Sequence, residues 1–112
     1  MRRLLAIALV LLAGLLLGLN QSALAADTLS GAQVFSVHCA GCHLNGGNII
    51  RRGKNLKLKA LQRNGYDSVE AIAQIITNGK NNMSAYRDRL TEQEIRDVAT
   101  YVLEQAEQGW RG

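Results

Sequence analysis

Two cysteines and a histidine fall within five residues of this 112-residue chain, in the run Cys39-Ala40-Gly41-Cys42-His43. The cysteines are three positions apart, so on a helical turn both thiols lie on the same side. The histidine follows at once and presents its imidazole from that side. This C-x-x-C-H spacing is typical of a c-type haem site, in which Cys39 and Cys42 form thioethers and His43 binds the iron. The sequence therefore predicts one covalently bound haem c as the cofactor.

Three other uses of the two cysteines have to be weighed against haem. A disulfide would close only a small loop and would leave His43 without a role. A thiol–disulfide oxidoreductase needs a preceding strand, and none is predicted before Cys39. A zinc site needs four ligands, but the one further candidate, His38, is adjacent to Cys39 and cannot complete a tetrahedron. We therefore favour haem over each alternative.

The first 25 residues have the pattern of a secretory signal peptide. Arg2 and Arg3 precede sixteen uncharged residues, 4–19, and Ala23-Leu24-Ala25 supplies the small-x-small pattern of a cleavage site. The alternative is an uncleaved membrane anchor, which would need about 20 apolar residues to cross the hydrocarbon. We expect residues 1–25 to be removed on export, leaving one domain at 26–112 that is not inserted in a membrane.

Charge and size narrow the classes of function. Thirteen Lys and Arg become eleven once Arg2 and Arg3 are removed, against nine Asp and Glu, which gives a net charge of +2. That balance does not indicate a nucleic-acid binder, and a domain this small often depends on a cofactor to complete its core. Six cations follow the haem motif with no acidic residue among them, and form either a docking patch for an acidic partner or a solvated face: Arg51, Arg52, Lys54, Lys57, Lys59 and Arg63.

Four helices and no strand are predicted after the leader, from hydrophobic periodicity and capping residues. We expect them at about 31–37 with Ser30 as N-cap, at 55–64, at 69–78 after Asp67 or Ser68, and at 92–108 after a capping box in 91–94. Gly65 and Gly79 mark the ends of the second and third helices. Two long turns, 44–54 and 80–90, separate the helices and are long enough to wrap a ligand.

A second ligand for the iron follows by elimination. Without the leader the chain has one methionine, Met83, and one histidine besides His43. His38 lies on the attachment side and cannot reach the opposite face of a haem. A thioether is a soft ligand that favours ferrous iron, so Met83 is the candidate. The alternative is a surface methionine or one that fills a packing gap.

With these residues in view, the region 26–112 resembles the cytochrome c6 family, the soluble lumenal electron carriers of cyanobacteria and algae. The resemblance rests on Gly31-Ala32-Gln33-Val34-Phe35, the haem motif, Asn78-Gly79-Lys80, Met83, Arg89-Leu90-Thr91, Tyr101-Val102 and Trp110. It implies an all-α class I cytochrome c fold, with about four helices around one haem. By this likeness Cys39 and Cys42 carry the haem, and His43 and Met83 are the axial ligands.

The resemblance also implies further features of fold and function. Gly31, Phe35 and Tyr101 would lie where the first and last helices cross. The protein would be a one-electron carrier and not an enzyme, in photosynthetic electron transport in a thylakoid lumen, or in a periplasm. Its partners would be cytochrome f of the cytochrome b6f complex and photosystem I, or a terminal oxidase. The alternatives are a haem-based sensor or peroxidase-like protein with an open iron position, and a thiol–disulfide oxidoreductase.

Two features depart from the family pattern. Family members usually have Met-Pro-Ala-Phe at the ligand, whereas this chain has Met83-Ser84-Ala85-Tyr86 and contains no proline. Serine lacks the fixed φ angle of proline, so we expect a less constrained loop. The basic run 51–63 is the second departure. Together they indicate a divergent subgroup of the family.

Overall fold

The structure is a computed structural model, and it describes residues 26–111. Within that range the chain forms five α-helices and two short 3₁₀ turns, without a strand: α2 (Thr28–His38), α3 (Ala40–His43), η1 (Leu44–Gly46), η2 (Arg52–Lys54), α4 (Leu58–Asn64), α5 (Val69–Asn78) and α6 (Glu92–Glu107). None of these helices is long and apolar enough to cross a membrane. The all-α prediction is confirmed, while the predicted leader, 1–25, lies outside the described residues.

Three predicted helix boundaries are confirmed by their capping contacts. The capping box at the start of α6 is complete, because Thr91 Oγ accepts from the Glu94 N–H at 3.1 Å and the Thr91 N–H donates to Glu94 Oε1 at 3.0 Å. Ser68 caps α5, its Oγ accepting from the Ala71 N–H at 3.1 Å. Gly79 ends α5 with a φ of 69°, a value that favours glycine.

Two other predicted boundaries were wrong. The N-cap of α2 is Asp27, not Ser30, because the Asp27 carboxylate accepts from the backbone N–H groups two and three positions on, at 3.0 and 3.1 Å. The helix predicted from Asn55 begins instead at Leu58. Asn55 Oδ1 accepts from the N–H two residues later at 2.9 Å, a local turn that competes with helix formation.

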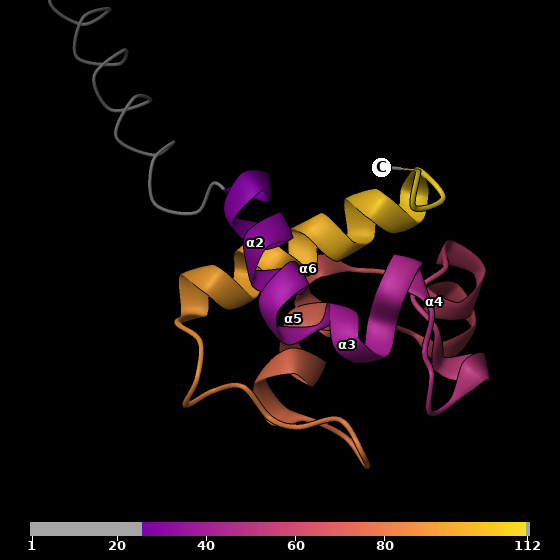
Figure 1. Cartoon of the computed structure of the whole chain (residues 1–112), viewed down its shortest axis with the longest axis horizontal. Helices are drawn as coiled ribbons and strands as arrows, with labels where there is room; N and C mark the ends of the chain where they lie inside the picture. Colours follow the sequence, from indigo (N-terminus) through magenta and orange to yellow (C-terminus); the bar gives the residue numbers. More distant parts are fainter. Residues whose placement is uncertain (1–25, 112) are drawn as a thin grey trace, which may run out of the picture.

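Helices α2 and α6 cross in close contact, as Figure 1 shows. Gly31 is buried at the crossing, where a Cβ atom would lie 2.8 Å from Tyr101 Cβ and against the carbonyl oxygen of Asp97. Beside it, the rings of Phe35 and Tyr101 pack with centroids 5.4 Å apart. The buried Asp97 carboxylate accepts from the Asp27 N–H at 2.9 Å and ties the start of α2 to α6. The expected crossing of the first and last helices is confirmed.

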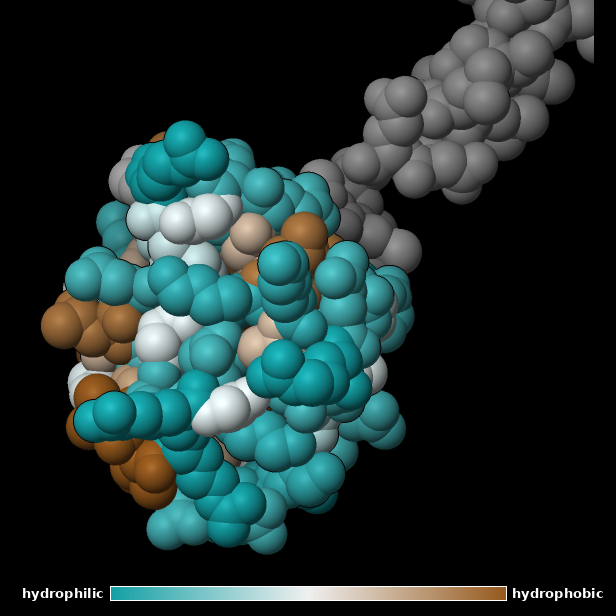
Figure 2. All heavy atoms as spheres, turned by 90° about the vertical axis from the view of Figure 1, so that its right-hand side faces the viewer, coloured by the Kyte–Doolittle hydropathy of each residue, from teal (hydrophilic) through white to brown (hydrophobic). Residues whose placement is uncertain are grey.

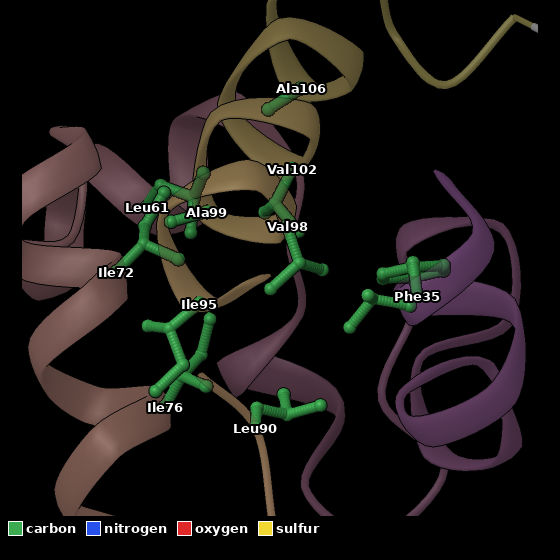
Figure 3. Close-up of a cluster of buried hydrophobic side chains, with 11 residues drawn as sticks. Phe35, Leu61, Ile72, Ile76, Leu90, Ile95, Val98, Ala99, Val102 and Ala106 are labelled. Atoms are coloured by element: carbon green, nitrogen blue, oxygen red, sulfur yellow. The ribbon is translucent and has the colours of Figure 1, made fainter. Parts of the chain in front are cut away.

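The hydrophobic core lies between α5, α6 and the inner face of α2. Figure 3 shows side chains from these helices pointing toward one another, together with Leu61 from α4 and Leu90 from the segment before α6. The least exposed members come from the middle of α6, where Val98 and Ala99 have no exposed surface. The cluster includes Val34, Phe35, Leu61, Ile72, Ile76, Leu90, Ile95, Val98, Ala99, Val102 and Ala106.

We predict that Gly31→Ala destabilises the protein, because the added methyl group must push α2 away from α6. Overpacking of this kind costs about 1–3 kcal/mol of unfolding free energy. Gly53→Ala is the matched control, since no atom lies within 4 Å of a Cβ there. Urea unfolding followed by circular dichroism measures both variants. Equal stability of the two variants would contradict the close crossing.

Candidate haem site

The four residues predicted to bind haem line one open cavity of about 240 Å³. Cys39, Cys42 and His43 reach it from the junction of α2 and α3, and Met83 reaches it from the loop between α5 and α6. The structure thus brings together residues that are forty positions apart in the sequence.

The haem motif forms a single helical turn. Cys39 lies between α2 and α3 as the cap residue of both helices, and its carbonyl oxygen accepts from the N–H groups of Cys42 at 3.2 Å and His43 at 2.9 Å. Both thiols are free; Cys42 is exposed, whereas Cys39 packs against the core. Burial raises the pKa of the Cys39 thiol to about 11, so the thiol is protonated at neutral pH. Because the thiolate is the nucleophilic form, burial makes the Cys39 thiol less reactive.

The ring of His43 is oriented by one backbone contact. Its Nδ1 lies 2.8 Å from the carbonyl oxygen of Gly47. A carbonyl oxygen only accepts hydrogen bonds, so Nδ1 carries the proton and Nε2 of the neutral ring keeps a free lone pair. That is the tautomer a metal-binding histidine needs, with the second nitrogen held by a partner. Gly47 was not identified from the sequence, because this contact depends on the path of the 44–54 turn.

The loop that carries Met83 is held without a proline. Lys80 and Met83 exchange two backbone hydrogen bonds, of 3.0 and 2.9 Å, which close a tight two-residue turn. Asn81 within the turn has a φ of 53°, a conformation that asparagine tolerates better than most residues. Gly79 packs against the loop backbone, where a Cβ would lie 2.6 Å from the Met83 carbonyl oxygen. The loosening expected from Ser84 is therefore offset by these contacts.

Tyr86 fastens the same loop to two helices. Its backbone N–H donates to the Ile76 carbonyl of α5 at 2.9 Å, and its hydroxyl donates to the His38 carbonyl of α2 at 3.1 Å. The guanidinium of Arg89 lies over the Tyr86 ring, with its central carbon 4.6 Å from the ring centroid. A phenylalanine at this position would lack the hydroxyl bond, so Tyr86 compensates in part for the missing proline. The sequence carried no signal for this long-range contact.

His38 lines the cavity and packs edge-on against Tyr86 with ring centroids 5.9 Å apart. Among residues 26–111 no group of three or more His, Cys, Asp and Glu side chains is arranged to hold a metal ion.

Both the side chains that form the cavity walls and the donor atoms that face the cavity suit a haem. Its inner wall is part of the hydrophobic core: Phe35, Leu61, Ile72, Ile76, Val98 and Val102. Exposed Arg51, Lys54 and Lys80 lie on its polar side and suit the carboxylates of a porphyrin. Two free thiols, one imidazole with a free Nε2 and one thioether complete a donor set that a c-type haem uses.

Comparison with known proteins identifies the family. The sequence model of "Cytochrome C oxidase, cbb3-type, subunit III" matches residues 26–102. A cytochrome c6-like protein of Nostoc sp. strain PCC 7120 is 63% identical over 99% of this chain and 100% of its own. Cytochrome c6 of Thermosynechococcus vestitus is 50% identical over 88% of both chains. The crystal structure of cytochrome c6C from Synechococcus sp. PCC 7002 superposes with a TM-score of 0.69, at 63% identity, over 70% of this chain and 96% of that one.

These similarities also bear on the divergent subgroup inferred from the loop around Met83. The identity to the c6-like and c6C proteins is 63%, against 50% to the Thermosynechococcus cytochrome c6. The two proteins with the higher identity are described as c6-like and as c6C. The chain therefore belongs to the cytochrome c6 family of haem electron carriers.

Proposed function

We propose that the chain carries single electrons on a haem c, which Cys39 and Cys42 would hold covalently and to whose iron His43 and Met83 would bind. The observation that supports this most directly is the convergence of these four residues on one cavity. When bound, the haem supplies an iron that changes its oxidation state by one electron. The protein has no substrate to turn over in this role, and we infer that it is not an enzyme.

The protein's own residues would favour fast transfer by keeping the site rigid. His43 is held by Gly47, and the Met83 loop is held by its tight turn and by Tyr86. Fixed ligands need little rearrangement when the charge of the iron changes. The thioether of Met83 and the apolar inner wall both favour the less charged ferrous state.

The distribution of charge supports an acidic redox partner. Residues 28–66 contain six Lys and Arg and no Asp or Glu, and the nine acidic residues lie at 27 and within 67–107. Lys54 and Arg63 donate to neutral oxygens, of Asn64 at 3.0 Å and Gly53 at 3.1 Å, so their charge is not neutralised by these contacts. Helix α4 lies on the right of Figure 1, and Figure 2 shows that side covered mainly by hydrophilic side chains.

From this charge pattern and the family, we infer that the carrier works between cytochrome f of the cytochrome b6f complex and photosystem I, or delivers electrons to a terminal oxidase. Residues 1–25 would direct export to a thylakoid lumen or periplasm, with a mature domain from Ala26.

Replacement of Met83 tests the ligand assignment. We expect Met83→Ala to keep its haem, because the thioethers do not involve that side chain. The iron would take a harder ligand, so the reduction potential should fall and the weak sulfur-to-iron band of the ferric spectrum should vanish. The variant should also bind carbon monoxide, and potentiometry with visible spectroscopy measures each effect.

Asp88→Ala is the control, because Asp88 is an exposed residue of the same segment that does not line the cavity, and it should leave both the potential and the band unchanged. If the native protein already binds carbon monoxide readily and lacks the sulfur band, Met83 is not a ligand. The haem-based sensor or peroxidase-like alternative would then apply.

The basic run is tested by salt and by charge reversal. If 51–63 steers docking, electron exchange with cytochrome f should slow as salt rises, since the Debye length shrinks to about 3 Å at 1 M. Lys59→Glu should lower the association rate measured by stopped flow. The double variant Gln33→Glu/Gln74→Glu changes the net charge by the same amount at exposed positions of α2 and α5. Equal slowing by both variants would show that only net charge matters.

A further inference from the structure

Trp110 lies three residues beyond the end of α6 in a backbone conformation that few residues adopt. Its φ is 60°, directly after Gly109 with a φ of 70°. A bulky residue in the left-handed region is strained, and such strain persists only where the surrounding structure enforces it. The contacts of the Trp110 side chain are therefore the features that can hold this conformation.

The indole ring of Trp110 is in contact on several sides. Its centroid lies 5.2 Å from that of Phe35 in α2 and 6.2 Å from that of Tyr101 in α6. Its Nε1–H donates to the carbonyl oxygen of Leu56 at 2.9 Å. The ring also lies against Gly46, where a Cβ atom would come within 2.5 Å of ring carbons. Trp110 therefore joins both crossing helices to the segment that follows the haem motif.

Gly46 and Leu56, which both contact the indole ring, are hydrogen-bonded to each other and so close a loop. The Leu56 N–H donates to the Gly46 carbonyl oxygen at 2.7 Å, so the ends of the 46–56 segment meet beneath Trp110. Gly47 is the next residue of that segment, and its carbonyl oxygen accepts the Nδ1–H of His43 at 2.8 Å. The glycine that Trp110 covers, Gly46, is thus directly bonded to Gly47, whose carbonyl group orients the imidazole.

We propose that Trp110 is a positioning residue for His43. By fixing Gly46 it fixes the carbonyl group of Gly47, and through it the orientation and basicity of the imidazole. A hydrogen bond to the second ring nitrogen makes a histidine ligand more basic, which favours the ferric state. The inference rests on the proposed role of His43 as an iron ligand. Loosening the Trp110 contact should weaken that bond and raise the reduction potential.

A purely structural role for Trp110 predicts a different result. Trp110 does not line the cavity, so its replacement does not open the haem site directly to water. If it only stabilised the fold, a variant would unfold more easily and its folded form would keep the native potential. The potential of the folded protein therefore separates the two roles.

The experiment compares Trp110→Phe and Trp110→Ala with the native holoprotein. Trp110→Phe keeps an aromatic ring but loses the N–H group that donates to the Leu56 carbonyl oxygen. This variant keeps the test possible if Trp110→Ala does not fold. The first readout is the exchange rate of the Leu56 amide hydrogen, which we expect to rise about tenfold. The second is the reduction potential, which should rise, and the third is the set of ferric haem-methyl proton shifts, which respond to the orientation of the imidazole.

Ile95→Ala is the matched control, because Ile95 is a buried core residue of α6 that does not line the cavity. It should lower stability while leaving the potential, the methyl shifts and the relative exchange of Leu56 unchanged. An unchanged potential and unchanged methyl shifts in both Trp110 variants would overturn the proposal, even if Leu56 exchanged faster. A native protein without a haem spectrum would instead refute the proposed function, and Leu56 exchange would still report on the contact.

Discussion

The direct backbone contact between α2 and α6 at Gly31 sets the geometry of the rest of the fold. No side chain separates the helices there, so the Asp97 carbonyl and the Tyr101 Cβ come close to Gly31. This approach brings Phe35 beside the aromatic residues of α6 and its C-terminal extension. It also fixes the end of α2, where Cys39 begins the haem motif. A larger residue at position 31 would disturb the core and the site together.

The hydrophobic core and the candidate site share the same residues. Side chains that a larger protein would cover with a further helix, among them Ile76 and Val102, line the cavity instead. A domain of this size buries little apolar surface on its own, so an apolar cofactor would complete the core. Covalent attachment would then serve stability as well as electron transfer, because a tethered group cannot leave the site. Because the core is small, long-range contacts such as those of Trp110 and Tyr86 also help to hold distant segments together.

The features that could be predicted from the sequence are those set by neighbouring residues. The capping box at Thr91, the cap at Ser68 and the C-x-x-C-H turn each depend on a few adjacent positions. Met83 could be proposed as a ligand from the sequence because elimination among the few soft ligands needs only composition. The N-cap of α2 was predicted at Ser30 instead of Asp27, because both residue types are good caps and they lie only three positions apart.

The features that could not be predicted depend on contacts between distant segments. The hydroxyl of Tyr86 reaches a carbonyl 48 positions away, and the indole of Trp110 reaches one 54 positions away. Gly47 orients His43 only because the intervening turn bends back on itself. Sequence patterns give residue types at such positions but not their partners, and these partners hold both proposed ligand segments in place.

A potentiometric titration of the exported protein, followed by visible absorbance, tests the central claim most directly. A carrier with one haem predicts a reversible single-electron transition, in which the ratio of oxidised to reduced protein changes tenfold for about 59 mV. The absorbance changes should be those of a haem, since the iron holds the electron. A colourless protein with a two-electron transition of about 30 mV per tenfold change would contradict the account and assign the redox chemistry to Cys39 and Cys42 as a dithiol.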